Sequence, residues 1–328
     1  MGINETNNSS NTEISLSKSI QFWLLSILDI PSIFCSLFLL YHLLTKQIRR
    51  STLNNHVIIK ILLISLFIQL IDIPLYLNFL RSNPVWPQTL VTCIVWWYAT
   101  HAMYNTTIIL TAWLYFERYI RIFHNEYIST KIKQWLFHYI SIIFFLIFPM
   151  IYYILVLFIP SCEQQFIYDY TQAWCALCPC YYNNNLSTIV DIAINSILPC
   201  LLIALFSIVL LIHTIWIKNI RLKRVVQWKQ YRKMIIQLFS ISSLFIIFNS
   251  PLMLYYLLYI LQYIPLDIDP QIEDYLNFLS YFSTLFLPFS ILFSLSHGCF
   301  RNGCKKFRKN FRKHRANIHP KKNPRLQH

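Results

Sequence analysis

The chain contains 328 residues, of which 56% are hydrophobic and only 12% are charged. An average soluble domain carries roughly 25% charged residues, so this chain lacks the polar surface that a soluble enzyme of its size needs. Its formal net charge is nevertheless +15, and its hydrophobicity argues equally against a disordered polycation. The composition predicts a membrane protein whose charges are sorted to one side of the bilayer.

Seven stretches are long and apolar enough to cross a bilayer, which takes about 20 mostly apolar residues. The first is too long for the apolar part of a typical signal peptide, and no small-residue cleavage site follows it. The predicted fold class is an all-α membrane protein, a seven-transmembrane helix bundle with a short amphipathic eighth helix. The stretches run approximately over Ile20–Leu44, Val57–Leu80, Leu90–Ile120, Trp135–Ile159, Ser187–Ile217, Met234–Tyr263 and Tyr275–Ser296.

The charges are distributed very unevenly around these stretches. The connections after the first, third and fifth stretches, together with the adjoining helix ends and the tail, hold 26 of the 28 basic residues and two of the 13 acidic residues. That side has a formal charge of +24, which leaves −9 for the rest of the chain. Since positive charge gathers on the cytosolic side, we expect a multi-pass plasma-membrane protein with its N-terminus outside and its C-terminus in the cytosol.

The predicted domain organisation follows from this topology. Residues 1–19 are expected to form an extracellular glycosylated N-terminus, residues 20–296 the bundle, and residues 297–328 a cytosolic basic tail with an amphipathic helix. An asparagine-rich disordered tail is the alternative reading of the N-terminus. The glycosylation acceptor sequences begin at Asn4, Asn7, Asn8 and Asn185.

The tail carries one apolar stripe, formed by Phe300, Cys304, Phe307 and Phe311 at helical spacing. Lysine and arginine fill its other faces, so we expect it to lie on the anionic inner leaflet and to bind membrane lipids. Cys299 and Cys304 are juxtamembrane candidates for palmitoylation. A seven-span chain makes a nucleic-acid partner for this basic run unexpected.

Two features mark the ends of the third stretch. Cys93 stands near its beginning, and Glu117-Arg118-Tyr119 stands at its end, 24 residues after Cys93. At about 1.5 Å per residue this spacing is roughly 36 Å, the thickness of a bilayer with its interfaces. On these residues the chain resembles the rhodopsin-like (class A) family of G-protein-coupled receptors, as a divergent invertebrate orphan type, over about residues 20–312.

The resemblance implies an extracellular ligand and a heterotrimeric G protein as partners. It implies that Glu117, Arg118 and Tyr119 form the coupling and activation switch, with Pro251 and Pro288 as hinges, and that Glu117 pairs with Arg118 in the resting bundle. It also pairs Cys93 with a cysteine before the fifth stretch. The sequence leaves Cys175, Cys178 and Cys180 open as that partner.

The chain departs from the family pattern at several places. Asn249 stands two residues before Pro251, where the family usually has tryptophan, and the usual Asn-Pro-x-x-Tyr motif is replaced around Pro288. No acid opens the sixth stretch, so the usual second partner of Arg118 is missing.

Intramembrane acids mark functional sites by default, and two of them suggest a ligand pocket. Asp72 is followed by Pro74, and Asp191 stands eight residues before Pro199. The alternative for each acid is a structural hydrogen bond to a neighbouring helix, and for aromatic neighbours it is packing. The pocket candidates are Asp72, Thr100, His101, Tyr104, Asp191, Asn195, Met253, Tyr256, Asn277 and Tyr281.

The charge balance favours a cationic ligand. The outward side carries −9 and would attract positive charge, and we expect a basic peptide. The resemblance argues against an amine receptor, which has aspartate seven residues after the helix-three cysteine where this chain has Thr100. It also argues against an opsin, because the seventh stretch has no lysine.

Other functions are weighed against this one. The alternative is a seven-span chemosensory channel subunit or small transporter without G-protein coupling. An enzyme is not expected, because the sequence shows no nucleophile–base pair, no HExxH motif and no paired intramembrane aspartates. No cofactor and no metal site are predicted, since the Cys175–Cys180 cluster has no accompanying histidines outside the membrane.

Overall fold

The computed structural model describes residues 17–45, 53–82, 84–123, 130–158, 169–176, 185–220, 225–261 and 272–294. Within these ranges all regular structure is helical, so the all-α prediction is confirmed there. Several predicted sites lie outside the described residues, namely Asn4, Asn7, Asn8, Cys178, Cys180, Cys299, Cys304 and the amphipathic tail helix.

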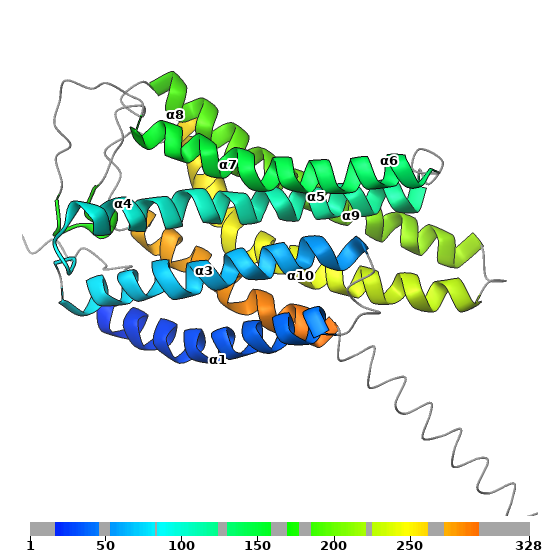
Figure 1. The fold of residues 1–328 in the computed structure, drawn as a ribbon, viewed down its shortest axis with the longest axis horizontal. Helices are drawn as coiled ribbons and strands as arrows, with labels where there is room; N and C mark the ends of the chain where they lie inside the picture. The colour runs from blue at the N-terminus through cyan, green and yellow to red at the C-terminus, as the bar shows by residue number, and fades with distance from the viewer. Residues whose placement is uncertain are drawn as a thin grey trace, which may run out of the picture.

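The helices lie side by side as one elongated bundle (Figure 1). Three runs are continuous helices with a wide π-helical turn inside them: α4–η1–α5, α6–η3–α7 and α8–η6–α9. The bounds are α1 Lys18–Thr45, α3 Leu53–Ser82, α4 Leu90–Tyr98, η1 Ala99–Met103, α5 Tyr104–Phe123, α6 Lys131–Trp135, η3 Leu136–Ile140, α7 Ser141–Phe158, η4 Ala173–Ala176, α8 Asn185–Asp191, η6 Ile192–Ile197, α9 Leu198–Ile220 and α10 Val225–Ile260, followed by a last helix over Ile272–Ser294.

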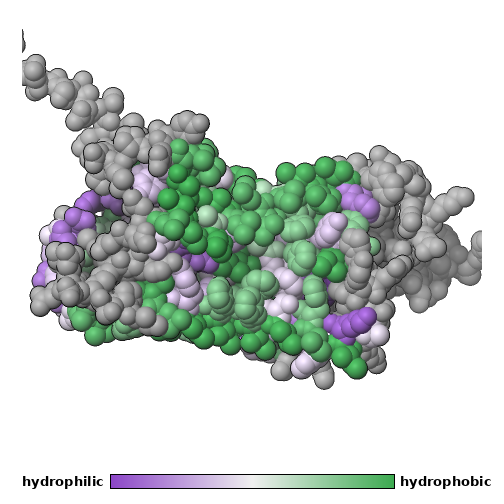
Figure 2. All heavy atoms as spheres, turned by 90° about the horizontal axis from the view of Figure 1, so that it is seen from above, coloured by the Kyte–Doolittle hydropathy of each residue, from purple (hydrophilic) through white to green (hydrophobic). Residues whose placement is uncertain are grey.

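Within the described ranges six helices are long and apolar enough to cross a membrane, so the chain is a multi-pass helical membrane protein. The face in Figure 2 agrees, because its middle is mostly hydrophobic and its strongly hydrophilic residues gather toward the two ends. The six are Lys18–Thr45, His56–Ser82, Leu136–Phe158, Leu186–His213, Gln237–Ile260 and Ile272–Ser294.

The run α4–η1–α5 covers the third predicted stretch but is not among these six. Its middle carries polar side chains, including Asn105, Thr106, Thr107 and Thr111, all of them buried. The three threonines donate to the carbonyls four residues earlier, at 2.6, 2.9 and 2.7 Å, which satisfies their hydroxyls within the helix. Since α5 packs against α3, α7 and α9, neighbouring helices rather than lipid surround its polar face.

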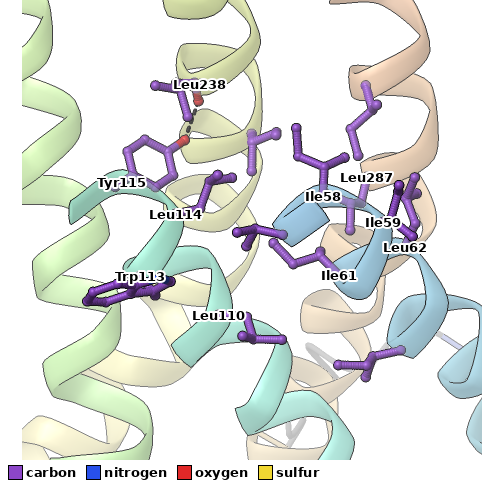
Figure 3. Close-up of a cluster of buried hydrophobic side chains, with 14 of the residues drawn as sticks. Ile58, Ile59, Ile61, Leu62, Leu110, Trp113, Leu114, Tyr115, Leu238 and Leu287 are labelled. Atoms are coloured by element: carbon purple, nitrogen blue, oxygen red, sulfur yellow. Dashed lines mark hydrogen bonds between the residues drawn. The ribbon is translucent and has the colours of Figure 1, made fainter. Parts of the chain in front are cut away.

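The bundle has two ends, which we name by their residues. The disulfide end carries Cys93, and the opposite Glu117 end carries Glu117. Between them, toward the Glu117 end, buried aliphatic side chains from α3, α5, α10 and the last helix pack together (Figure 3). Across this cluster the hydroxyl of Tyr115 on α5 donates to the carbonyl of Leu238 on α10, so the layer joins these two helices directly.

A buried polar junction joins α1, α3 and the last helix. Gln69 Nε2 donates to Ser32 Oγ at 2.8 Å and to the Thr284 carbonyl at 3.3 Å, and Ser36 Oγ donates to Gln69 Oε1 at 3.3 Å. Ser32 Oγ in turn donates to the Leu285 carbonyl at 2.8 Å. All of these groups are shielded from lipid, and the bonds fix the positions of three helices relative to one another.

Candidate functional site

A cavity of about 370 Å³ opens among the helices toward the disulfide end. Its walls come from α3, α4, η1, α5, the η4 loop, α8, η6, α10 and the last helix, so residues far apart in the sequence meet there. The lining residues are Asp72, Trp97, Thr100, His101, Tyr104, Asn105, Ala173, Trp174, Thr188, Asp191, Ile192, Ser196, Leu252, Met253, Tyr256, Glu273, Asn277, Ser280 and Tyr281.

The structure brings nine of the ten pocket candidates together around this cavity. The tenth, Asn195, does not line it. Asn195 lies one helical turn behind Asp191 and donates Nδ2 to Asp191 Oδ1 at 2.6 Å. It therefore supports a wall residue rather than forming the wall itself.

Asp72 is a buried carboxylate that accepts three hydrogen bonds on one oxygen. Its Oδ1 accepts from Trp96 Nε1 and from Thr100 Oγ1, each at 2.8 Å, and from the Tyr281 hydroxyl at 3.2 Å. The donors come from α4, η1 and the last helix, and all three are neutral. Asp72 is therefore hydrogen-bonded at the cavity wall without a cationic partner among these contacts.

Asp191 occupies a second corner of the cavity. Besides Asn195, the hydroxyl of Tyr153 on α7 donates to Asp191 Oδ1 at 3.4 Å. That hydroxyl accepts from Asn105 Nδ2 at 2.5 Å, and Asn105 Oδ1 accepts from Ser196 Oγ at 3.3 Å. Because a hydroxyl has a single proton, the chain of bonds has one direction, from Asn105 through Tyr153 to the carboxylate.

His101 is oriented by its own helix. Its ring stacks on Trp97, with the centroids 4.3 Å apart, and its Nδ1 lies 3.0 Å from the Trp97 carbonyl. A carbonyl only accepts, so Nδ1 carries the proton. The π-helical turn η1 places Thr100 and His101 at the cavity, in keeping with the frequent occurrence of π-turns at functional sites.

The remaining wall comes from α5, α10 and the last helix. Tyr104 donates its hydroxyl to Asn249 Oδ1 on α10, and Tyr256 donates to Glu273 Oε1 at 3.3 Å. Asn249 thus anchors a cavity residue from α10. Its Nδ2 is buried and has no hydrogen-bond partner among the described residues.

The cavity wall next to the disulfide is a short ordered loop. Cys93 is bonded to Cys175, one of the three partners that the sequence leaves open. Trp174 and Cys175 both have left-handed backbone, with φ of 52° and 57°, which side chains with a Cβ avoid. The disulfide and the contact of Trp174 with Tyr76, at 6.4 Å between ring centroids, hold this turn against the cavity.

The same loop is braced by hydrogen bonds near its start. Thr171 donates its hydroxyl and its backbone N–H to Asp169 Oδ1, at 2.6 and 2.9 Å. These two bonds hold the pKa of the Asp169 carboxyl below its usual value. The Val85 N–H donates to the Tyr170 carbonyl at 2.7 Å, which ties the loop to the segment before α4.

The charge of the cavity is one-sided. Asp72, Asp191 and Glu273 contribute three carboxyl groups from three helices, and no lysine or arginine is among its lining residues. A larger hollow of about 560 Å³ lies between α1 and α3 beside Arg81, but no carboxyl group lines it. The cavity around Asp72 is therefore suited to a positively charged group.

Some residues of interest were not singled out by sequence patterns. Glu273 stands one helical turn before Asn277, and Trp97 one turn before His101, so the helical repeat could have indicated both. Asp29 on α1 is buried, and its Oδ1 has no hydrogen-bond partner among the described residues. It does not line the cavity.

The Glu117 end holds a second polar cluster. Glu117 is 1% exposed and accepts on Oε1 from Arg121 and from His138 Nδ1, the latter at 2.5 Å. Residues four apart on a helix share a face, so Arg121 meets the Glu117 carboxylate directly. The pairing of Glu117 with Arg118 stays a prediction.

The other switch candidates are spread along their helices. Arg118 is 4% exposed, and its Nε has no hydrogen-bond partner among the described residues. Tyr119 packs on Phe206 of α9, with the ring centroids 5.5 Å apart. Pro251 lies inside α10 and Pro288 inside the last helix, where each removes one backbone hydrogen bond.

Comparison of the sequence with protein-family models gives no match, and comparison with curated proteins gives none either.

Proposed function

We propose that the chain is a plasma-membrane receptor that binds a cationic ligand in the cavity at the disulfide end and activates a heterotrimeric G protein at the Glu117 end. In this proposal α4–η1–α5 is a seventh membrane crossing, the disulfide end faces outward and the Glu117 end faces the cytosol. The observation that carries the proposal is the cavity with three carboxyl groups and no lysine or arginine in its lining.

The ligand class follows from the cavity. Asp72 receives its hydrogen bonds from three neutral donors, and a buried carboxylate is costly in a membrane protein unless a cation accompanies it. A protonated group on a ligand would offset that cost. The volume of about 370 Å³ lies in the range of small-ligand sites, so a small cation or the basic end of a peptide fits it.

The interior between the two ends favours a receptor over a channel subunit or a transporter. The aliphatic cluster of Figure 3 contains fully buried side chains, with Leu62, Leu110 and Leu114 each 0% exposed. A polar solute passing from the cavity to the Glu117 end would have to cross this layer. A receptor needs only to shift these helices relative to one another.

Coupling at the Glu117 end is tested by Arg118→Ala. Nucleotide exchange on G proteins is measured in cells expressing a promiscuous heterotrimer and stimulated with a panel of basic peptides and amines. The variant should lose the response while its surface expression persists, because the proposal assigns the contact with the G protein to Arg118. An undiminished response of the variant would remove that role from Arg118.

A further inference from the structure

A buried carboxylate at the Glu117 end joins two helical runs of the bundle. Glu117 lies on α5, and His138 lies on the π-helical turn η3 between α6 and α7. Their side chains are 1% and 0% exposed, and His138 Nδ1 is 2.5 Å from Glu117 Oε1. The contact thus connects the third and fourth helical runs away from water.

The direction of this hydrogen bond follows from a third side chain. Arg121 Nη2 lies 3.2 Å from the same His138 nitrogen and also contacts Glu117 Oε1. A single ring nitrogen cannot donate to the carboxylate and accept from the guanidinium at once. At 2.5 Å from a carboxylate oxygen the nitrogen is the donor, and a hydrogen bond to a charged acceptor is stronger than a neutral one.

The position of His138 is fixed from outside the cluster as well. Its ring lies 5.7 Å from the ring of His56 on α3 and 5.0 Å from that of Tyr139. His138 lies inside the π-helical turn η3, a kind of turn that is frequent at functional sites, and its imidazole contacts Glu117 on α5. His138 is therefore held in place and donates the hydrogen bond that attaches Glu117, at the end of α5, to η3.

Arg118 is next to Glu117 in the sequence and so projects from a different face of α5. Fastening Glu117 to η3 sets the rotation of α5 about its axis, which in turn sets the direction of Arg118. We propose that His138 is a positioning residue, whose hydrogen bond to Glu117 holds the end of α5 against η3 and thereby orients Arg118. The inference rests on the proposed function, because it gives Arg118 the contact with the G protein.

Two substitutions separate the hydrogen bond from the packing of the ring. His138→Asn retains a donor near the position of Nδ1 and loses the ring, whereas His138→Phe retains a ring and loses the donor. We expect ligand-free nucleotide exchange on purified heterotrimers to fall about tenfold with His138→Phe, the size of one hydrogen bond to a charged group, and to stay near the wild-type rate with His138→Asn. Leu136→Ala, at an exposed position of the same turn, is the matched control and should have little effect.

The opposite order, with His138→Asn impaired more than His138→Phe, would show that the ring acts only by packing and would overturn the proposal, as would equal rates. The exchanged pair, Glu117→His with His138→Glu, should recover much of the lost rate, because Arg121 contacts both positions.

A measurement without a G protein distinguishes this inference from the proposed function. The stabilities of the wild type, Glu117→Gln, His138→Phe and the double variant form a cycle in detergent. We expect the double variant to be no less stable than the less stable of the two single variants, since each single change already removes the Glu117–His138 contact. Additive losses of stability would overturn the proposal. If the losses are non-additive but the wild-type chain activates no G protein, only the proposed function is refuted.

Discussion

Replacing Gln69 should weaken the bundle more than replacing any single one of its partners. Gln69→Leu nearly preserves the side-chain volume and removes three interhelical hydrogen bonds, to Ser32, Ser36 and the Thr284 carbonyl. Side-chain hydrogen bonds between membrane helices average about 0.6 kcal/mol. The free energy of unfolding should therefore fall by about 2 kcal/mol, roughly a 20- to 30-fold change in the unfolding equilibrium.

The assay is reversible unfolding in mixed micelles, followed by helical circular dichroism as the denaturing detergent is increased. Ser36→Ala loses one of the three bonds and should cost about a third as much. Leu70→Ala is the control, because Leu70 neighbours Gln69 on α3 but is 52% exposed at the lipid-facing surface. A Gln69→Leu variant no less stable than Ser36→Ala would refute the view that this junction holds α1, α3 and the last helix together.

Three further outcomes are expected. Trp96→Phe keeps the aromatic packing and removes one of the three donors to Asp72, so it should lower the free energy of unfolding by about 0.6 kcal/mol in the same assay, and a neutral result would mean that the bond does not contribute. Cys175→Ser releases the loop that places Trp174 at the cavity; it should reduce ligand potency as much as Trp174→Ala does, and a response equal to wild type in concentration–response curves would contradict that placement. Tyr104→Phe should change ligand potency less in a chain that already carries Asn249→Leu, because the Tyr104–Asn249 bond is then already lost. An equal factor in both backgrounds would mean that this bond does not contribute to the ligand response.

Most of the fold prediction followed from the lengths of the apolar stretches in the sequence. Each predicted stretch overlaps a helical run of the structure, and six of these runs are long and apolar enough to cross a membrane, because about 20 apolar residues leave the backbone few alternatives to a helix there. The third run is the instructive case. Its polar residues bond within the helix and face its neighbours, and no composition average can show that a polar face is covered.

The lining residues of the cavity were predictable where helical spacing alone determines which residues lie at the same depth in the bundle and on the same side of a helix. Asp72 and Asp191 were found as intramembrane acids, and their neighbours by counting turns. Asn195 was misplaced because the π-helical turn η6 alters the register just before Pro199. The bond of Glu117 to His138 was beyond sequence reasoning, since it depends on how the third and fourth runs rotate against each other.

The disulfide partner of Cys93 was likewise beyond sequence reasoning, because it depends on a local backbone turn. All three stand at similar distances before Pro199, so spacing does not discriminate among them. The left-handed turn at Trp174 and Cys175 brings that sulfur to Cys93, and nothing in the residue types around it indicates such a turn.

The most direct test of the proposed function pairs cationic ligands with neutral analogues of the same shape. Basic peptides and amines, with their acetylated or amide counterparts, are applied to cells that carry the wild-type chain or Asp191→Asn, and G-protein activation is recorded against concentration at matched surface expression. The account predicts activation by a cationic member only, with potency lost in Asp191→Asn. Activation by the neutral analogue at equal potency, unchanged by Asp191→Asn, would contradict a cation-binding cavity.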